Sequence, residues 1–593
     1  MHRGNRGLHC CGGLAIFANP HQGETRSLAV IDFDCSAYDK KFVHRLTLSD
    51  KVERRGCGRS CMWMVLQSTC QMDLWCCRPG RWTFVRFNSI CCQQGFGPDG
   101  ARLPMIAFDN SYARLPEAFY ARVLPARFAA PRLIRLNHAL AAQLGLDPEW
   151  LATPEGIEVL AGQRIAPGAE PIAMAYAGHQ FGHFVPQLGD GRAILLGEVI
   201  GCDGARRDLQ LKGSGPTPYS RRGDGFAALG PVLREYLVSE AMAALGIPTT
   251  RALAAMATGE QVWRERSLPG AALLRVASSH IRVGTFQFFA ARGQVEALRQ
   301  LADHVIARHY PQAAAAAQPY LALLESVIAA QAELIAQWLL VGFIHGVMNT
   351  DNMSVAGETI DYGPCAFMDA YDPETVFSSI DEFGRYAYAR QPAIAQWNLT
   401  RLAEALLPLL DEDRDEAVAQ AKVVLDTFAA RFNAAYLGGL RRKLGLGEER
   451  EGDNALAQDL LRRMAANKSD FTLTFRRLCD AAETPEADAA VAALFQNPQD
   501  FVEWAARWHA RLALEEREAG DSGDAMRQVN PAFIPRNHLV EAAIAAAVSS
   551  GDFTPFETLL TVLANPYEDQ PAHAAYAAAP PAGVGLYRTF CGT

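Results

Sequence analysis

The chain has 593 residues, 49% hydrophobic and 20% charged, which is ordinary for a soluble globular protein that can bury a large core and hold more than one domain. Its charge is uneven, because residues 1–105 carry a net +6 and residues 106–593 a net −15, and an acidic body argues against nucleic acid as a partner. The longest apolar run, Leu334–Met348, is interrupted by Gln337 and His345, so we expect a buried helix there and no membrane partner.

Residues 1–105 also differ from the rest of the chain in cysteine content. They hold ten of the 14 cysteines, and the sparse cysteine elsewhere is typical of a reduced, cytoplasmic protein. A zinc module is the alternative for this segment, although it has no Cys-x-x-Cys pair. Its first 20 residues have too short an apolar stretch for a signal peptide. We therefore expect residues 1–105 to be a poorly ordered segment outside the functional domain.

The elements expected after residue 105 change from strands to helices. Residues 106–165 should form an extended lead-in and then helices, including "PRLIRLNHALAAQLGL". Within residues 173–215, "GRAILLGEVIG" and "RRDLQLKGSG" have strand patterns. "GPVLREYLVSEAMAALGIP" is an expected helix with a Gly-Ile-Pro stop, and "RALAAMAT" and "GAALLRVASS" are expected strands. From about residue 295 nearly everything is expected to be helical, apart from a loop at 345–364.

The order of these elements is that of a two-lobed kinase. We predict an α+β, protein-kinase-like fold with a strand-rich N-lobe, a helical C-lobe and additional C-terminal helices. The expected boundaries are 1–105 for the cysteine-rich segment, 106–290 for an N-terminal extension and the N-lobe, and 291–593 for the C-lobe and C-terminal region.

The loop "HGVMNTDNMSVAGETIDYGP" resembles the metal-binding half of a kinase site. Kinases place an Asn seven residues after a His, and an Asp-Phe-Gly further on. His345 and Asn352 keep that interval, and Asp361 begins an Asp-Tyr-Gly, but Val347 occupies the position of the catalytic Asp. We predict that Asn352 and Asp361 bind Mg²⁺ together with phosphates and water, the alternative being a plain turn.

A few cations are candidates for phosphate contacts. The chain has seven lysines against 49 arginines. Lys212, at the end of an expected strand, is the only lysine between Lys51 and Lys422. A kinase orients such a lysine with a Glu from the following helix, here Glu235 or Glu240. Arg275 and Arg282 would form an anion clamp if the turn between them brings them together. The alternative for all of these is an exposed side chain without a role.

Two glycine-rich turns complete the candidate nucleotide site. "LGDGR" contains Gly189, Gly191 and Arg192, and "RRGDG" contains Asp224 and Gly225. Glycines let backbone N–H groups approach phosphates. Ordinary turn chemistry is the alternative reading of both motifs.

Taken together, these motifs resemble the selenoprotein O (YdiU) family of pseudokinases. The resemblance rests on "YAGHQFG", "QLGDGRAILLGE", "LKGSGPTPYSRRGDG", "REYLVSEAMAALGIPTTRAL", "HGVMNTDNMS", "DYGP" and "NPAFIPRNHLVEAAI", and it covers the chain from about Ala107 to the end. It implies a kinase-like fold that transfers AMP from ATP to Ser, Thr or Tyr hydroxyls of proteins and releases pyrophosphate, with Mg²⁺ or alternatively Mn²⁺ as cofactor.

The resemblance also implies roles for single residues. It implies nucleotide contacts from Gly189, Gly191, Arg192, Lys212, Asp224, Gly225, Arg275, Arg282 and Asp361. It makes Asp351 the catalytic base, Asn352 and Asp361 the metal ligands, and Glu235 the partner of Lys212. It also implies that the nucleotide lies flipped relative to kinases, with its α-phosphate toward the acceptor. A base at the kinase position would then be misplaced, so the apolar Val347 there would not prevent the reaction.

Other readings of the sequence stay open. The site could belong to an ordinary phosphotransferase, against which Val347 counts, or to an inactive ATP-binding scaffold, against which the joint presence of Lys212, Asp351, Asn352 and Asp361 counts. The near-terminal Cys591 could form a reversible disulfide if it is accessible, or it could be inert.

Overall fold

The computed structural model describes residues 62–67, 71–78, 81–88, 106–515, 519–581 and 587–590. The chain divides into two units, Met1–Leu103 and Pro104–Thr593. In the first unit, β1 (Met62–Gln67), β2 (Gln71–Arg78) and β3 (Arg81–Asn88) form an antiparallel sheet in that order. The remainder of residues 1–105 lies outside the described residues, so the expectation of poor order stays a prediction.

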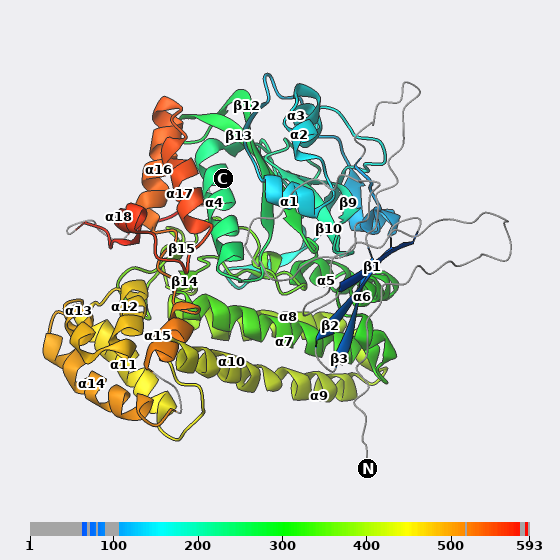
Figure 1. Ribbon diagram of the computed structural model, residues 1–593. Helices are drawn as coiled ribbons and strands as arrows, with labels where there is room; N and C mark the ends of the chain where they lie inside the picture. Colours follow the sequence, from blue (N-terminus) through cyan, green and yellow to red (C-terminus); the bar gives the residue numbers. More distant parts are fainter. Residues whose placement is uncertain are drawn as a thin grey trace, which may run out of the picture. The chain divides into compact units, whose positions relative to one another are not determined.

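An antiparallel sheet is the centre of the strand-rich part of the second unit (Figure 1). Its spatial order is β4 (Tyr120–Arg122), β6 (Ile172–Met174), β9 (Ala193–Ile200), β10 (Arg206–Lys212), β13 (Ser267–Ala277), β12 (Arg251–Trp263) and β5 (Arg132–Leu136), with β11 (Ala227–Ala228) paired to β13. The four strands expected from "GRAILLGEVIG", "RRDLQLKGSG", "RALAAMAT" and "GAALLRVASS" are thereby confirmed.

Helices cover both faces of this sheet because its strands are apolar on both sides. On β13, Leu274 and Val276 face a core with α1 (His138–Gln143), α2 (Pro148–Leu151) and α3 (Pro154–Leu160). Leu273, which directly precedes Leu274, faces the other way, toward α4 (Leu229–Ala244), α16 (Asn537–Ser550) and α17 (Thr554–Leu563). This alternation at period two is what a strand buried on both faces requires. The C-terminal helices thus return to the strand-rich part and pack on α4, as Figure 1 shows.

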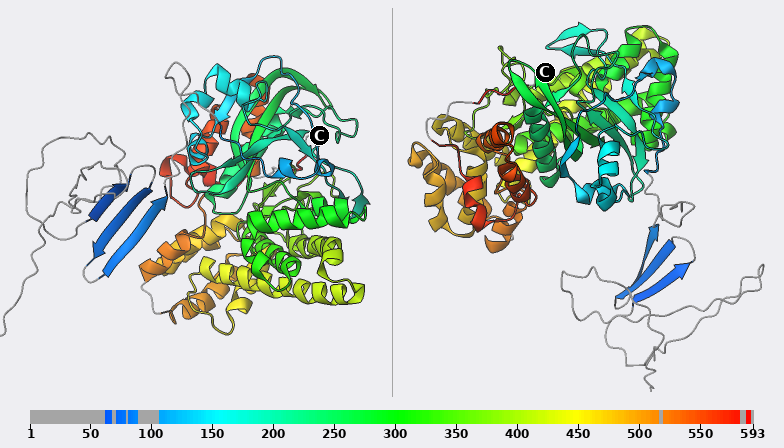
Figure 2. Two further views of the ribbon diagram at one scale, coloured as in Figure 1. Left: turned by 90° about the vertical axis from the view of Figure 1, so that its right-hand side faces the viewer. Right: turned by 90° about the horizontal axis from the view of Figure 1, so that it is seen from above.

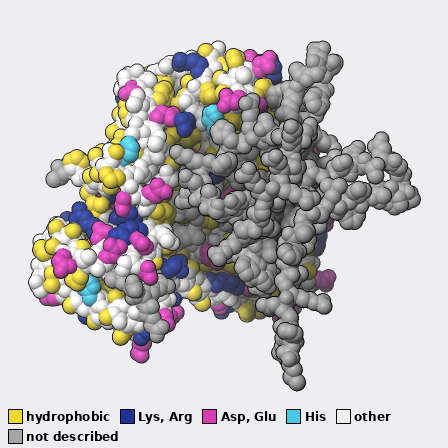
Figure 3. Space-filling model, in the orientation of Figure 1, with side chains coloured by type: hydrophobic (Ala, Val, Ile, Leu, Met, Phe, Trp, Pro, Cys, Tyr) yellow, Lys and Arg dark blue, Asp and Glu magenta, His cyan; other side chains and the backbone are white. Residues whose placement is uncertain are grey.

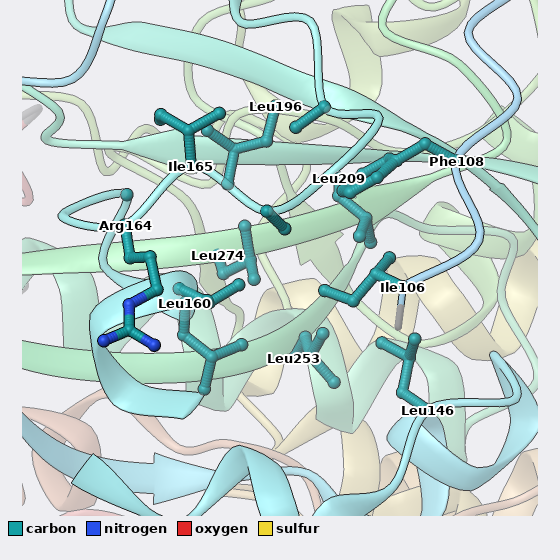
Figure 4. Close-up of a pocket in the computed structure, with 14 residues that line it drawn as sticks. Ile106, Phe108, Leu146, Leu160, Arg164, Ile165, Leu196, Leu209, Leu253 and Leu274 are labelled. Atoms are coloured by element: carbon teal, nitrogen blue, oxygen red, sulfur yellow. The ribbon is translucent and has the colours of Figure 1, made fainter. Parts of the chain in front are cut away.

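The core between the sheet and α1–α3 contains one small cavity (Figure 4). Leu196, Leu209, Leu253 and Leu274 line it from the strands, and its volume is about 20 Å³. That is roughly the space of one water molecule. The cavity is therefore a packing defect of an apolar core and cannot be a nucleotide site.

Most of the rest of the second unit is helical, apart from the two-stranded sheets β7 (Gly178–Gln180) with β8 (His183–Val185) and β14 (Phe343–Ile344) with β15 (Ala366–Phe367). Its helices are α5 (Val283–Ala290), α6 (Val295–His309), α7 (Pro319–Leu340), α8 (Gln391–Leu410), α9 (Arg414–Leu425), α10 (Thr427–Lys443), α11 (Asp453–Asn467), α12 (Phe471–Glu483), α13 (Asp488–Ala492), α14 (Pro498–Leu512), α15 (Ala519–Arg527) and α18 (Ala574–Ala577). Helices α7 to α10 lie below the sheet in Figure 1, and the side view in Figure 2 shows the same layering. One large apolar core joins them. An antiparallel sheet with many helices confirms the mixed class that the sequence predicted.

Among the described residues, α7 is the one helix that has the length and composition to cross a membrane. However, 61% of its most apolar window is buried inside the protein, as expected for a core helix.

Over helices α11–α14, Figure 3 shows acidic and basic side chains intermixed on the visible surface. Ion pairs on α11 join Asp459 to Arg463 and Arg462, at 3.1 and 2.9 Å.

Two expectations about elements were wrong. "PRLIRL" is not helical but forms the edge strand β5, and the helix α1 begins only after Asn137, whose side chain accepts the N–H of Leu140. The apolar run Leu334–Met348 is helical only to Leu340, because Gly342 takes a φ of 76° and the chain continues as the short strand β14 (Phe343–Ile344). The boundary expected at 290/291 falls just after α5, and as a domain boundary it stays a prediction.

Candidate active site

A cleft of about 720 Å³ lies where the strand-rich part meets the loop 345–364, a volume usual for small-molecule sites. It is lined by all the residues that were predicted to contact the nucleotide, to bind the metal or to act as the catalytic base. These residues are Gly189, Gly191, Arg192, Lys212, Asp224, Gly225, Arg275, Arg282, Asp351, Asn352 and Asp361. The fold thus brings together side chains that are up to 172 positions apart in the sequence.

Lys212 and Glu235 form a buried ion pair at the back of this site. Lys212 is the last residue of β10, Glu235 lies on α4, and Lys212 Nζ is 2.5 Å from Glu235 Oε2. The other candidate, Glu240, instead pairs with Arg251 at 2.6 Å. Burial and the nearby Arg275 lower the pKa of Lys212 to about 8, although Glu235 opposes the shift. The lysine is thus positioned as a kinase positions its own.

Arg275 and Arg282 converge on the carboxylate of Asp361. Arg275 Nη2 is 2.5 Å from Oδ1, Arg282 Nη2 is 3.4 Å from Oδ2, and Lys212 Nζ is 3.9 Å from Oδ1. Burial alone would raise the pKa of Asp361, but these cations hold it well below its ordinary value. Arg275 also pairs with Glu235. The fold therefore brings the two arginines together, as an anion clamp requires, and here both contact the carboxylate of Asp361.

Asp190 is a member of this network that the sequence analysis missed. Its carboxylate is buried, lies 3.4 Å from Arg282 Nη1 and accepts hydrogen bonds from Gln210 and from the N–H of Met174, both at 3.1 Å. The guanidinium of Arg282 also lies 4.4 Å from the ring centroid of Tyr176. Asp190 stands between the two glycines of "LGDG", where an Asp is usual in any turn, so its sequence context gave no specific signal.

The glycine-rich turns have backbone requirements of their own. Gly189 has a φ of 98°, and a Cβ there would lie 2.4 Å from the ring of Tyr219. Gly225 has a φ of 71°, and a Cβ would lie 2.1 Å from the backbone of Gly215. Both conformations favour glycine whether or not a nucleotide is bound. Asp224 is held by Arg264 at 2.8 Å, which fixes the second turn to the end of β12.

Asp351, the expected base, lines the same cleft. It lies in a short 3₁₀ turn, Thr350–Asn352, and is only 8% exposed. Its Oδ2 accepts a hydrogen bond from Gln180 Nε2 at 3.1 Å, and its Oδ1 is buried without a partner in the described part of the chain. Burial raises the pKa of Asp351 to about 6, although the hydrogen bond from Gln180 opposes the shift. A carboxylate with a pKa near neutrality suits a general base.

Asn352 and Val347 are joined by a hydrogen bond. Asn352 Nδ2 donates to the carbonyl of Val347 at 3.1 Å, which leaves the amide oxygen as the atom that can ligate a cation. Asp361, the other expected ligand, has a φ of 62°, a strained conformation of the kind found at functional sites. Within the described residues, no three His, Cys, Asp or Glu side chains gather closely enough to hold a metal alone. A metal here would need further oxygens, such as those of phosphates, which is the usual arrangement for Mg²⁺.

The C-terminal residues reach the rim of the cleft. Thr589 exchanges backbone hydrogen bonds with Phe377 and Ser379, at 2.9 and 3.0 Å, and its hydroxyl donates to the carbonyl of Pro364 at 2.6 Å. Pro364 lines the cleft. Cys591 lies outside the described residues, so both alternatives for it, a reversible disulfide and an inert cysteine, stay open.

Comparison with known proteins decides the family. The family model described as protein adenylyltransferase SelO matches residues 103–564. The chain belongs to this family. A protein nucleotidyltransferase YdiU of Methylorubrum populi is 69% identical over 495 residues, covering 82% of this chain and 99% of that protein. The protein of the same name from a Bradyrhizobium species, strain BTAi1, is 68% identical over 486 residues, with the same shares.

Membership of the SelO family confirms the resemblance found in the sequence and makes the chain an enzyme, a nucleotidyltransferase. The matched range contains every residue of the cleft and begins at residue 103, so most of residues 1–105 lies outside it. The roles that the resemblance implies for the single residues stay predictions.

Proposed function

We propose that this chain is a protein adenylyltransferase with a two-lobed, kinase-like fold. It transfers AMP from ATP to a Ser, Thr or Tyr hydroxyl of a protein and releases pyrophosphate. One observation carries the proposal. The buried carboxylate of Asp351 has one oxygen without a partner in the described part of the chain, while the position of the kinase base holds the apolar Val347.

The cation cluster would hold the triphosphate. Lys212, Arg275 and Arg282 now pair with three carboxylates, those of Glu235, Asp361 and Asp190. Phosphate oxygens would take over part of that role. Arginine forks and a lysine are the residues that bind phosphates most strongly. Since pyrophosphate leaves with more negative charge than it had in ATP, the same cations would stabilise it in the transition state.

Asn352 and Asp361 would hold Mg²⁺, or alternatively Mn²⁺. Both line the cleft, and an amide oxygen and a carboxylate are hard ligands that suit either ion. Arg275 and Arg282 already contact the Asp361 carboxylate, so a metal would share that carboxylate with them. When bound, the cation would supply Lewis-acid stabilisation of phosphate charge.

Asp351 would act as the general base. Its carboxylate would take the proton of the acceptor hydroxyl while that oxygen forms a bond to the α-phosphorus. The bond from the α-phosphorus to the bridging oxygen would break at the same time, and its electron pair would leave with pyrophosphate. A nucleotide bound with its α-phosphate toward the acceptor suits this arrangement, because Arg192, Arg275 and Arg282 could then hold the β- and γ-phosphates.

Intact-mass measurement of an acceptor protein incubated with the enzyme, ATP and Mg²⁺ tests this proposal. We expect a gain of one AMP, since the apolar Val347 leaves the kinase position without a base. A gain of one phosphate would favour the phosphotransferase. No gain, with ATP bound, would favour the inactive scaffold.

A further inference from the structure

The hairpin "GHQFGHFV" lies against the loop that carries Asp351. Its strands β7 (Gly178–Gln180) and β8 (His183–Val185) are antiparallel. Phe181 and Gly182 connect them with φ angles of 51° and 87°. Two successive positive φ angles are typical of a type I′ turn, but a bulky residue such as Phe adopts one only where its surroundings impose it.

The loop supplies those surroundings. The N–H of Phe181 donates to Asn349 Oδ1 at 3.0 Å, and its ring packs edge-on against Tyr386 at 5.2 Å. The N–H of His179 donates to Thr350 Oγ1 at 2.7 Å. Backbone groups of the hairpin are thus bonded to both residues that precede Asp351, and these bonds do not involve the side chain of Gln180.

Gln180 makes the remaining connection, to Asp351 itself. Its amide Nε2 donates to Asp351 Oδ2 at 3.1 Å, whereas Oδ1 has no partner in the described part of the chain. Gly178 lies against the same carboxylate, because a Cβ added there would be 2.6 Å from Oδ1 and 3.0 Å from Cγ. The hairpin therefore fixes one carboxylate oxygen and closely borders the other.

We propose that Gln180 is a positioning residue for the general base, and that the β7–β8 hairpin holds Asp351 in its catalytic orientation. This inference rests on the role proposed above for Asp351. A neutral amide is suited to the task, since it fixes the carboxylate by a hydrogen bond without the full charge that would neutralise a base. Gly178 serves the same end, because any side chain there would displace the carboxylate.

The test uses Gln180→Leu in the full-length protein, which keeps most of the side-chain volume and removes the donor. We expect kcat for AMP transfer to fall on the order of 10- to 100-fold, the usual effect of a small misplacement of a catalytic group. ATP affinity should stay at its wild-type value. His183→Ala is the matched control, because His183 pairs with Gln180 across the hairpin but is exposed, and it should behave as wild type.

The same substitution in an Asp351→Ala background separates positioning from folding. If Gln180 acts through Asp351, its loss should not lower the residual rate of Asp351→Ala any further. Gly178→Ala should resemble Gln180→Leu in kcat and in this non-additivity. An equal further loss in the Asp351→Ala background, together with a lower melting temperature, would mean that Gln180 only supports folding.

The outcomes distinguish this inference from the proposed function. Normal AMP transfer by the wild type and by Gln180→Leu would overturn the positioning role alone. Wild-type turnover by Asp351→Ala would overturn the base and its positioning together. A wild type that transfers no AMP would overturn the proposed function and this inference with it.

Discussion

The two buried lysines of the second unit, Lys212 and Lys443, lie in regions that are built differently. Lys212 in the cleft is 2.5 Å from Glu235 Oε2 and 3.9 Å from Asp361 Oδ1. Lys443, at the end of α10, lies over the ring of Phe475 at 4.4 Å and has no carboxylate partner in the described part of the chain. Burial lowers the pKa of both, to about 8 and about 7.

This difference shows what marks a functional site. A buried cation occurs in both regions, but only the cleft surrounds it with further cations, carboxylates and open volume. The paired charges of the cleft border an open volume, so a ligand can bind to them. Between α10 and α12, by contrast, the single charge of Lys443 is packed against aromatic rings. Substitutions in the cleft should therefore change activity with little effect on stability, and substitutions at Lys443 should do the reverse.

The largest effect is expected at Asp351. Asp351→Ala removes the proton acceptor, so kcat for AMP transfer should fall by about 10²–10⁴-fold, with a smaller change in KM for ATP. Steady-state kinetics with a protein acceptor measure this. The melting temperature should stay close to the wild-type value. Turnover like that of the wild type would show that Asp351 is not the base.

Much of this cleft could be predicted from the sequence, because short motifs carry their chemistry locally. Glu235 and Glu240 could not be told apart, since five residues along a helix rotate a side chain by about 140° and the sequence does not say which of the two faces the strand. Gln180 and Asp190 were within quoted motifs but received no role, because their partners, Asp351 and Arg282, are far away in the chain. Long-range contacts of this kind leave no spacing signal.

The fold was predictable to a similar degree. Strands with alternating or continuous apolar runs and the helix α4 were recognised from their periodicity. The edge strand β5 was mistaken for a helix because its five residues are too few to distinguish the two periods. The return of α16 and α17 to α4 depends on tertiary packing, which the order of the elements does not reveal.

Lys443→Met should stabilise the protein by roughly 2–4 kcal/mol at pH 7, because it removes a buried cation at the loss of a cation–π contact. The pKa of Lys443 is about 7 in the folded state, against an ordinary value of 10.5 in the unfolded chain. Between these values the unfolded chain binds a proton that the folded chain does not, so wild-type stability gains from rising pH. The advantage of Lys443→Met should therefore shrink from pH 7 to pH 10 in denaturant unfolding. An advantage independent of pH would contradict the lowered pKa.

Lys212→Met is the matched substitution in the cleft. It removes one charge-assisted phosphate contact, so the Kd for ATP should rise on the order of 10- to 100-fold. Lys443→Met is its control and should bind ATP as the wild type does. Calorimetric titration with ATP measures both. Equal affinities for the two variants would remove the distinction between the two regions.

The smallest effect is expected from deleting residues 1–104. These residues precede every motif of the cleft, and the family match begins only at residue 103. The shortened protein should keep its ATP affinity and kcat within about two-fold, a difference below 0.5 kcal/mol. A folded protein that no longer binds ATP would show that the segment contributes to the site.

The most direct test of the central claim follows the phosphates of ATP. The protein is incubated with an acceptor protein and Mg²⁺, once with ATP labelled at the α-phosphate and once with ATP labelled at the γ-phosphate. The proposed role of Asp351 as the base, with the apolar Val347 at the kinase position, predicts that protein becomes labelled from the α-position only, and that Asp351→Ala abolishes most of that label. Protein labelled only from the γ-position would contradict the account and identify a kinase.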